Sequence, residues 1–336
     1  MTLTSLGDMA QTFMMRRLTA SIKQDARLAA QELTTGRSAD VSKRLQGGLA
    51  DLTGVEATLS RLKSYRMASD SAALTADSMQ TVFRTIDSVT EGIGVSLLAV
   101  STHENTRTLG ALVADTAQRL DAVMNALNTK MGDTTLFAGI ASDGPAMASS
   151  DVILTALEAA ITADGAVTVA QIETSTKAWL QSPTGFAAVA YLGAAGATAL
   201  AVSAEDRVDL GITAADPALR DTLQSLALVA LVARGTVIAD PATGAALVQS
   251  AGLLLLQNHS DRATLAGRLG LAQARIDQAQ TRNTAEASAL QILRSNMVAV
   301  DPYEAATRME AAQNQLETLY SVTARLSRLS LVDFLR

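Results

Sequence analysis

The stretch LGALVADTAQRLDAVMNAL, residues 109–127, decides the fold class of this chain. Its mostly apolar stripe alternates in steps of four and three residues, which places the stripe on one face of an α-helix. A heptad-like stripe of this kind is typical of a helix that packs lengthwise along another helix. We predict that this helix ends at Met131-Gly132, where glycine suits a C-terminal cap. The stripe consists of Leu109, Val113, Thr116, Leu120, Val123 and Leu127.

Both ends of the chain favour long helices. The five prolines lie at positions 145, 183, 217, 241 and 302, so neither end bears the cost of about 3 kcal/mol that proline imposes inside a helix. A helical stripe precedes the stretch quoted above, and Gly92 and Gly94 predict a break between two helices. That earlier stripe consists of Leu45, Leu49, Leu52, Val55, Leu59 and Leu62.

The middle of the chain, residues 140–215, is rich in Ala, Gly, Thr and Ser. It predicts two short helices, 150–163 and 167–181, the first with Ser149 or Ser150 as its N-cap. Strands are predicted at 185–191, 198–203 and 207–212, the last two as a hairpin around Ala204-Glu205-Asp206. Each of the pairs Asp216-Pro217, Asp240-Pro241 and Asp301-Pro302 predicts a helix start.

The fold class predicted from these patterns is mainly α. The N- and C-terminal segments form a long antiparallel helical bundle or coiled coil, and a small mixed α/β domain is inserted in the middle. We expect a terminal coiled-coil domain (1–41 and 301–336), an axial helical bundle (42–139 and 216–300) and an outer inserted domain (140–215).

The two terminal segments carry apolar stripes for assembly or partner binding. A helix with one apolar stripe is marginal alone in water, so we expect these segments to be disordered until the protein assembles. The N-terminal positions are Leu6, Met9, Phe13, Leu18, Ile22 and Leu33. The C-terminal positions are Leu316, Leu319, Val322, Leu326, Leu329, Val332, Phe334 and Leu335.

Composition argues against several classes of function. The formal net charge is −6, which disfavours a nucleic-acid partner because such binding needs a basic surface. The absence of cysteine excludes disulfides and cysteine-bound metal. With only His103 and His259, and with His259-Ser260-Asp261 adjacent in sequence rather than brought together from separate segments, we predict no catalytic, cofactor-binding or metal-binding residues and no enzyme activity. The N-terminus does not match a Sec-type signal peptide, and Leu253–Leu256 is too short to span a bilayer.

Several segments resemble the flagellin superfamily, in particular its filament-side hook–filament junction proteins. The closing segment ends in Ser330-Leu-Val-Asp-Phe-Leu335 and is similar to the closing helix of those proteins, which ends in a Ser-Leu-aliphatic-Asp-aromatic-Leu run. The loop at 38–44 differs from the family pattern of Asn, Pro, Ser and Asp. The other segments with a resemblance are 28–37, Leu136-Phe-Ala-Gly139, 214–220 and 265–276.

The resemblance implies a structural component of the bacterial flagellum that joins the hook to the flagellin filament. It implies type III export without a cleaved signal peptide and an extracellular location. The implied partners are the hook-side junction protein, flagellin, an export chaperone and copies of the chain in a ring, with no membrane insertion. The alternatives are a filament flagellin, a soluble helical enzyme and a signalling coiled coil.

Overall fold

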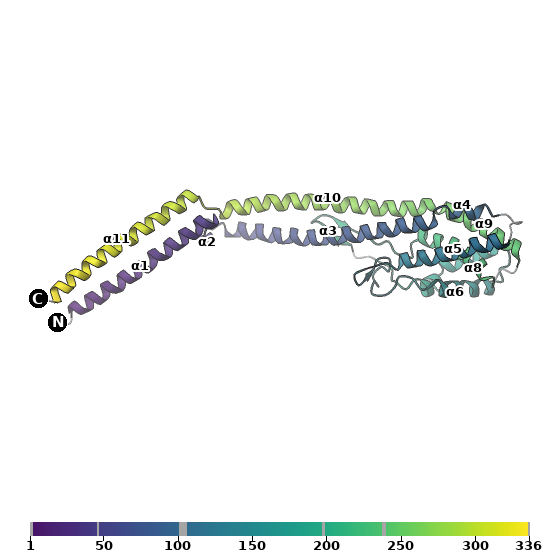
Figure 1. The fold of residues 1–336 in the computed structure, drawn as a ribbon, viewed down its shortest axis with the longest axis horizontal. Coiled ribbons are helices and arrows are strands. Elements are labelled where there is room, and N and C mark those ends of the chain that lie inside the picture. The colour runs from purple at the N-terminus through teal and green to yellow at the C-terminus, as the bar shows by residue number, and fades with distance from the viewer. Residues whose placement is uncertain (1–2, 46, 101–105, 197–198, 237–239, 335–336) are drawn as a thin grey trace. The chain divides into compact units, whose positions relative to one another are not determined.

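The computed structural model describes residues 3–45, 47–100, 106–196, 199–236 and 240–334, without side-chain placement for 3–8, 106 and 326–334. The described part is mainly α-helical with two two-stranded sheets (Figure 1), which confirms the predicted fold class. The helices are α1 (Leu3–Thr35), α2 (Val41–Leu45), α3 (Leu49–Thr90), α4 (Ile93–Leu98), α5 (Thr106–Leu127), α6 (Ser150–Ala163), α7 (Val169–Gln181), α8 (Pro217–Arg234), α9 (Pro241–Gln257), α10 (His259–Val298) and α11 (Pro302–Phe334). The sheets are β1 (Lys130–Met131) with β2 (Thr134–Thr135), and β3 (Leu200–Ala201) with β4 (Arg207–Val208).

The chain divides into two compact units. The first contains residues 1–62 and 284–336, and the second contains residues 63–283. Helices α3 and α10 contribute to both units. The three-domain division predicted from the sequence stays a prediction.

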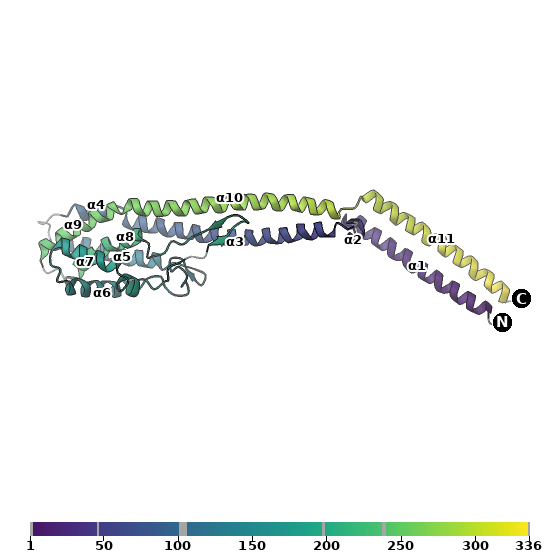
Figure 2. The same ribbon diagram turned by 180° about the vertical axis from the view of Figure 1, so that it is seen from behind.

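The main core lies in the second unit, where α5, α8 and α9 pack together (Figure 2). The α5 stripe from Val113 to Leu127 is buried, as its heptad-like spacing predicts. Helix α8 is buried on all sides from Thr222 to Leu231, which identifies it as the central helix. It begins at Asp216-Pro217 and ends at Gly235, whose φ of 64° is the left-handed conformation that suits a C-cap.

Two predictions about the middle of the chain are wrong. Helix α5 ends at Leu127 rather than at Met131-Gly132, because Gly132, with φ of 60°, occupies the turn between β1 and β2. The stretch 185–191 is not a strand but contains a π-helical turn, Phe186–Ala190. The Phe186 ring is buried edge-on against Trp179, and this burial, rather than strand pairing, fixes the local conformation.

Other predictions in this region are confirmed. The two short helices are α6, with Ser149 as its N-cap, and α7, which starts two residues later than predicted behind a Thr168–Gln171 capping box. The hairpin around residues 204–206 is present as β3 and β4.

A short break separates each of the long helices α3 and α10 from a shorter helix: α4 follows α3, and α9 precedes α10. The break after α3 lies at Glu91-Gly92, as the glycines predict, and α10 is separated from α9 by Asn258. The short helices α4 and α9 approach closely through two glycines. A methyl group on Gly252 would lie 2.8 Å from the Gly94 carbonyl oxygen, the Leu97 Cβ and the Leu98 nitrogen.

Gly252→Ala is therefore expected to destabilise the second unit by about 1–3 kcal/mol, because a Cβ forces the α4 backbone away. This cost exceeds the gain of up to about 1 kcal/mol that alanine brings to a helix. Gly267→Ala and Gly270→Ala are matched controls in α10, where a Cβ meets open space, and both are expected to stabilise. Urea denaturation of the three variants measures this difference, and stabilisation by Gly252→Ala would show that the contact is loose.

Candidate assembly surface

Helices α1 and α11 form an antiparallel pair within the first unit. The Lys23 ammonium lies 5.8 Å from the centre of the Tyr320 ring, and Arg308 Nη2 lies 2.8 Å from Glu32 Oε2. The apolar core of the pair is narrow. Its largest cluster consists of Ile22, Ala312 and Leu319, with Met15, Ala26 and Leu316 partly buried against them. Two small residues, Ala29 and Ala305, are also buried.

Large apolar side chains on α1 remain uncovered by α11. Met9 is 70% exposed and Phe13 is 67% exposed, and these two lie one helical turn apart on the same side of α1. Met14 and Leu18 are also exposed, on a different side of the helix. A helix that is apolar on several sides is normally buried in a larger structure. We call Met9, Phe13, Met14 and Leu18 the α1 apolar surface.

The structure separates the predicted assembly residues into three groups. Ile22, Leu316 and Leu319 belong to the contact between α1 and α11. Met9, Phe13, Leu18, Leu33 and Val322 are exposed. For the third group the structure describes the helical backbone but not the side chains: Leu6, Leu326, Leu329, Val332 and Phe334. Leu335 lies outside the described residues. Their roles in assembly stay predictions.

The buried carboxylate of Glu32 joins the α1–α11 pair to the segment after α1. The sequence did not indicate this role. Glu32 Oε1 accepts hydrogen bonds from the Ala39 nitrogen at 2.9 Å and from Ser38 Oγ at 3.4 Å. Its other oxygen pairs with Arg308 of α11. The segment itself is held by backbone bonds from Ser38 to Val298 and from Val300 to Gly36. One carboxylate therefore fixes three parts of the first unit.

An open groove of about 610 Å³ lies beside this carboxylate. Its lining contains apolar residues of α1 and α11 together with side chains of both charges, including Asp25, Asp40, Lys43 and Arg44. This mixed lining suits contact with another protein surface better than the mostly apolar, enclosed lining of a small-molecule site.

The second unit carries a group of acidic side chains beside α8. Burial raises the pKa of Asp216, against the opposing effects of Arg268 and Arg220. Burial also raises the pKa of Asp221, against Lys177 and Arg220 and with a contribution from Asp261. A carboxyl whose pKa is raised on folding favours the folded state at low pH, and this advantage is lost as the pH rises through the folded-state pKa.

Asp221→Asn is therefore expected to make the second unit more stable than the wild type at pH 7, with the difference shrinking as the pH falls toward 4. Urea denaturation of both proteins at pH 7 and pH 4.5 measures this trend. Asp143→Asn, at an exposed position, is the control for the loss of one negative charge. A difference that does not change with pH would contradict the burial effect.

The candidate chemical residues named from the sequence lie apart or at the surface in the described part of the chain. His259, Ser260 and Asp261 are consecutive exposed residues in the first turn of α10, and His103 lies outside the described residues. Asp206, in the acidic turn, pairs with Arg282 of α10. Among the described residues, no group of three or more His, Cys, Asp or Glu side chains is arranged to hold a metal ion. None of the described helices contains an apolar segment long enough to cross a membrane.

Comparison with protein families finds a match to the bacterial flagellin C-terminal helical region over residues 257–335. This segment contains α10 and α11. A comparison with curated protein sequences gives no match.

Among solved structures, the fold is similar to one described as a flagellar hook-associated protein from Vibrio parahaemolyticus. The TM-score is 0.53 at 11% sequence identity, and the similarity covers 74% of this chain and 96% of the other. The two chains thus share a fold. The C-terminal part of this protein is thus similar to the helical region of flagellin, which is a structural protein.

Proposed function

We propose that this protein is a structural component of the bacterial flagellum, located outside the cell and delivered there by the flagellar type III export apparatus. Within the flagellum, it acts as an adaptor that joins the hook to the flagellin filament. Its partners are the hook-side junction protein, flagellin and further copies of itself in a ring, and an export chaperone holds it before export. The α1 apolar surface, next to a flagellin-type C-terminal region, carries this proposal.

The physical argument starts from the narrow core of the α1–α11 pair. Among the described side chains of α1 and α11, five apolar residues are buried and three of them are alanine. This burial does not compensate for ordering two helices of 33 residues each, since fixing each residue costs about 1–2 kcal/mol of backbone entropy. Further apolar burial must come from neighbouring molecules. Burying a large apolar side chain contributes about 1.5–3 kcal/mol, and the α1 apolar surface offers four such side chains.

A filament flagellin is the second candidate, because the matched C-terminal region is that of flagellin itself. Two features favour the adaptor. The closing Asp333-Phe334 pair resembles the junction proteins, and the fold is shared with a chain described as hook-associated.

Immunogold electron microscopy of intact cells distinguishes the two candidates. Antibody against residues 140–215 is expected to label a single cluster between hook and filament. Label along the whole filament would identify a flagellin instead. Protein that stays in the cytoplasm, with no label on any flagellum, would refute a flagellar function.

A further inference from the structure

The hairpin of β3 and β4, residues 200–208, lies across α3 and α10 in the second unit (Figures 1 and 2). It forms a small apolar cluster that is separate from the main core. The cluster consists of Ala72 of α3, Val202 and Val208 of the hairpin, and Ile276 and Ala279 of α10.

Polar contacts attach the hairpin to both helices. The Val202 carbonyl oxygen accepts hydrogen bonds from Ser69 Oγ of α3 at 3.3 Å and from Asn283 Nδ2 of α10 at 2.7 Å. Asp206 at the turn pairs with Arg282 of α10. The turn itself is closed by Ser203 Oγ, which accepts a hydrogen bond from the Asp206 nitrogen at 2.9 Å. One backbone carbonyl therefore links two helices that are far apart in sequence.

The contacts of the hairpin coincide with an edge of the second unit. The main core reaches α3 only from Ala76 onward and α10 only up to Leu269. Beyond these residues, the buried side chains of α3 and α10 within the unit are Ala72 and Ser69 on one helix and Ile276, Ala279 and Asn283 on the other. Each of them contacts the hairpin cluster or bonds the hairpin. The compact unit ends at Asn283 itself.

Direct contacts between the two helices in this region are weaker. Gln273 Nε2 donates to Asp77 at 2.7 Å, and Gln280 Nε2 donates to Asp70 at 2.9 Å. Both pairs are exposed, and exposed polar pairs contribute at most about 1 kcal/mol each. The hairpin therefore supplies most of the burial that keeps these segments together.

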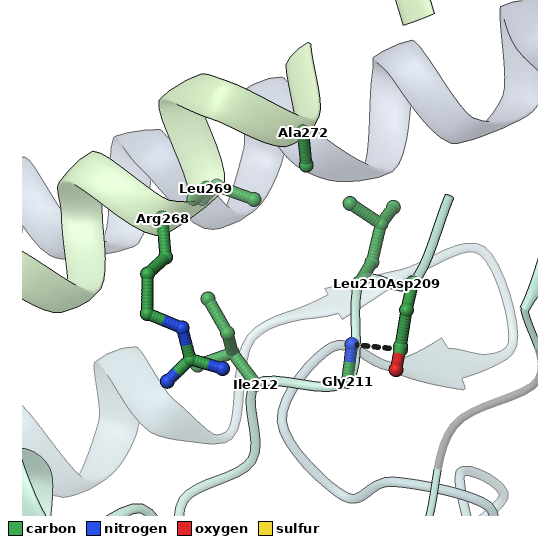
Figure 3. A pocket seen from close by; sticks show the side chains of 7 residues that line it. All are labelled: Asp209, Leu210, Gly211, Ile212, Arg268, Leu269 and Ala272. Carbon is green, nitrogen blue, oxygen red and sulfur yellow. Dashed lines mark hydrogen bonds between the residues drawn. The ribbon is translucent and has the colours of Figure 1, made fainter. Parts of the chain in front are cut away.

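The hairpin is joined to the main core by a short leg, residues 209–212. Leu210 of this leg contacts both apolar clusters. A cavity of about 150 Å³ separates the leg from α10, with Arg268, Leu269 and Ala272 on the α10 side (Figure 3). Packing between the leg and α10 is therefore incomplete at this point.

We infer that the hairpin 200–208 is a strap, a conformational device that holds α3 at residues 69–73 against α10 at residues 272–283. With the strap in place the paired helices are ordered to the edge of the second unit. With the strap released, both segments open locally while the main core stays folded. This inference does not depend on the proposed flagellar function.

Hydrogen exchange of the full-length chain, followed by mass spectrometry, tests the strap. In the variant Val202→Ala/Val208→Ala, amides in 69–73 and 272–283 are expected to exchange about tenfold faster or more, since the strap loses apolar burial on both helices. Amides in α5 and α8 are expected to keep their wild-type rates. Val152→Ala/Val167→Ala changes two exposed valines of the same unit and is the matched control.

A second variant, Asn283→Ala, removes one hydrogen bond to the strap and leaves the apolar cluster in place. It is expected to accelerate exchange in the same two segments by a smaller factor. Equal acceleration in α5 and α8 would show that the hairpin is an ordinary part of one cooperative core. Unchanged exchange in both segments would show that α3 and α10 hold together without the strap. Either result overturns the inference.

Discussion

Replacing Met9, Phe13 and Leu18 together with serine is expected to abolish incorporation of the protein into flagella. These side chains are exposed in the single chain, so the variant keeps the α1–α11 core and the second unit. In an assembly, each buried side chain contributes about 1.5–3 kcal/mol. The loss of three therefore weakens each contact by about 4 kcal/mol or more, which corresponds to roughly a thousandfold in affinity.

The measurement is a swimming assay combined with immunoblots of the culture medium and of isolated flagella. If the protein is exported as proposed, the variant is expected in the medium and not in the flagella, because the substitutions remove assembly contacts and leave the rest of the chain unchanged. The control replaces Val152, Val167 and Leu192 with serine, since these are equally apolar and exposed but lie in the second unit. Normal filaments in the triple variant of α1 would show that this surface makes no essential contact.

Helical periodicity predicted the fold because it records which face of a helix is buried. The stripe of α5 and the buried positions Met79, Phe83 and Ile86 of α3 follow that spacing into the core. Helix starts at Asp216-Pro217 and Asp240-Pro241 were equally predictable, since proline suits the first helical position and an acidic residue precedes it.

Helix ends and short irregular segments were less predictable. Glycine after an apolar stripe suits both a helix cap and a tight turn, and at Gly132 the turn between β1 and β2 is formed. The continuous apolar run from Phe186 to Tyr191 suits a buried strand, but Phe186 is buried against Trp179 in a π-helical turn instead. Tertiary contacts decide such cases, and a short window of sequence does not contain them.

The candidate assembly surface was predictable only in part. The sequence marks the apolar positions of α1 but does not show which of them α11 covers, so Ile22 and Met9 look alike until the helices are paired. Buried charges were missed for a related reason. Glu32 and Arg262 have the same appearance in the sequence as the solvent-facing charges of any amphipathic helix.

Arg262→Ala is expected to lower the free energy of unfolding of the second unit by about 3 kcal/mol. The Arg262 side chain of α10 is only 3% exposed. Its Nε lies 3.1 Å from Asp87 Oδ1 of α3, and its two terminal nitrogens donate to Thr222 of α8 and Thr90 of α3, each at 3.2 Å. Removal of this buried, hydrogen-bonded guanidinium leaves its three partners without a donor and leaves a cavity in its place.

The two threonines explain why arginine is required at this position. Thr90 Oγ1 donates its hydrogen to the Ile86 carbonyl, and Thr222 Oγ1 donates to the Ala218 carbonyl. Both hydroxyls therefore offer only acceptor sites, and arginine is a donor-only group with a planar fork that reaches several acceptors at once. Arg262→Lys is accordingly expected to recover only part of the loss, because a single ammonium does not span all three partners.

Guanidinium chloride denaturation of the purified chain measures the cost, with Arg275→Ala as the control. Arg275 lies on the same helix and is exposed, so its removal is expected to change stability by less than about 0.5 kcal/mol. Equal effects of the two alanine variants would mean that apolar burial alone joins α3, α8 and α10. A large effect of Arg262→Ala alone, with partial recovery in Arg262→Lys, would show that the Arg262 guanidinium holds α3, α8 and α10 together at this point.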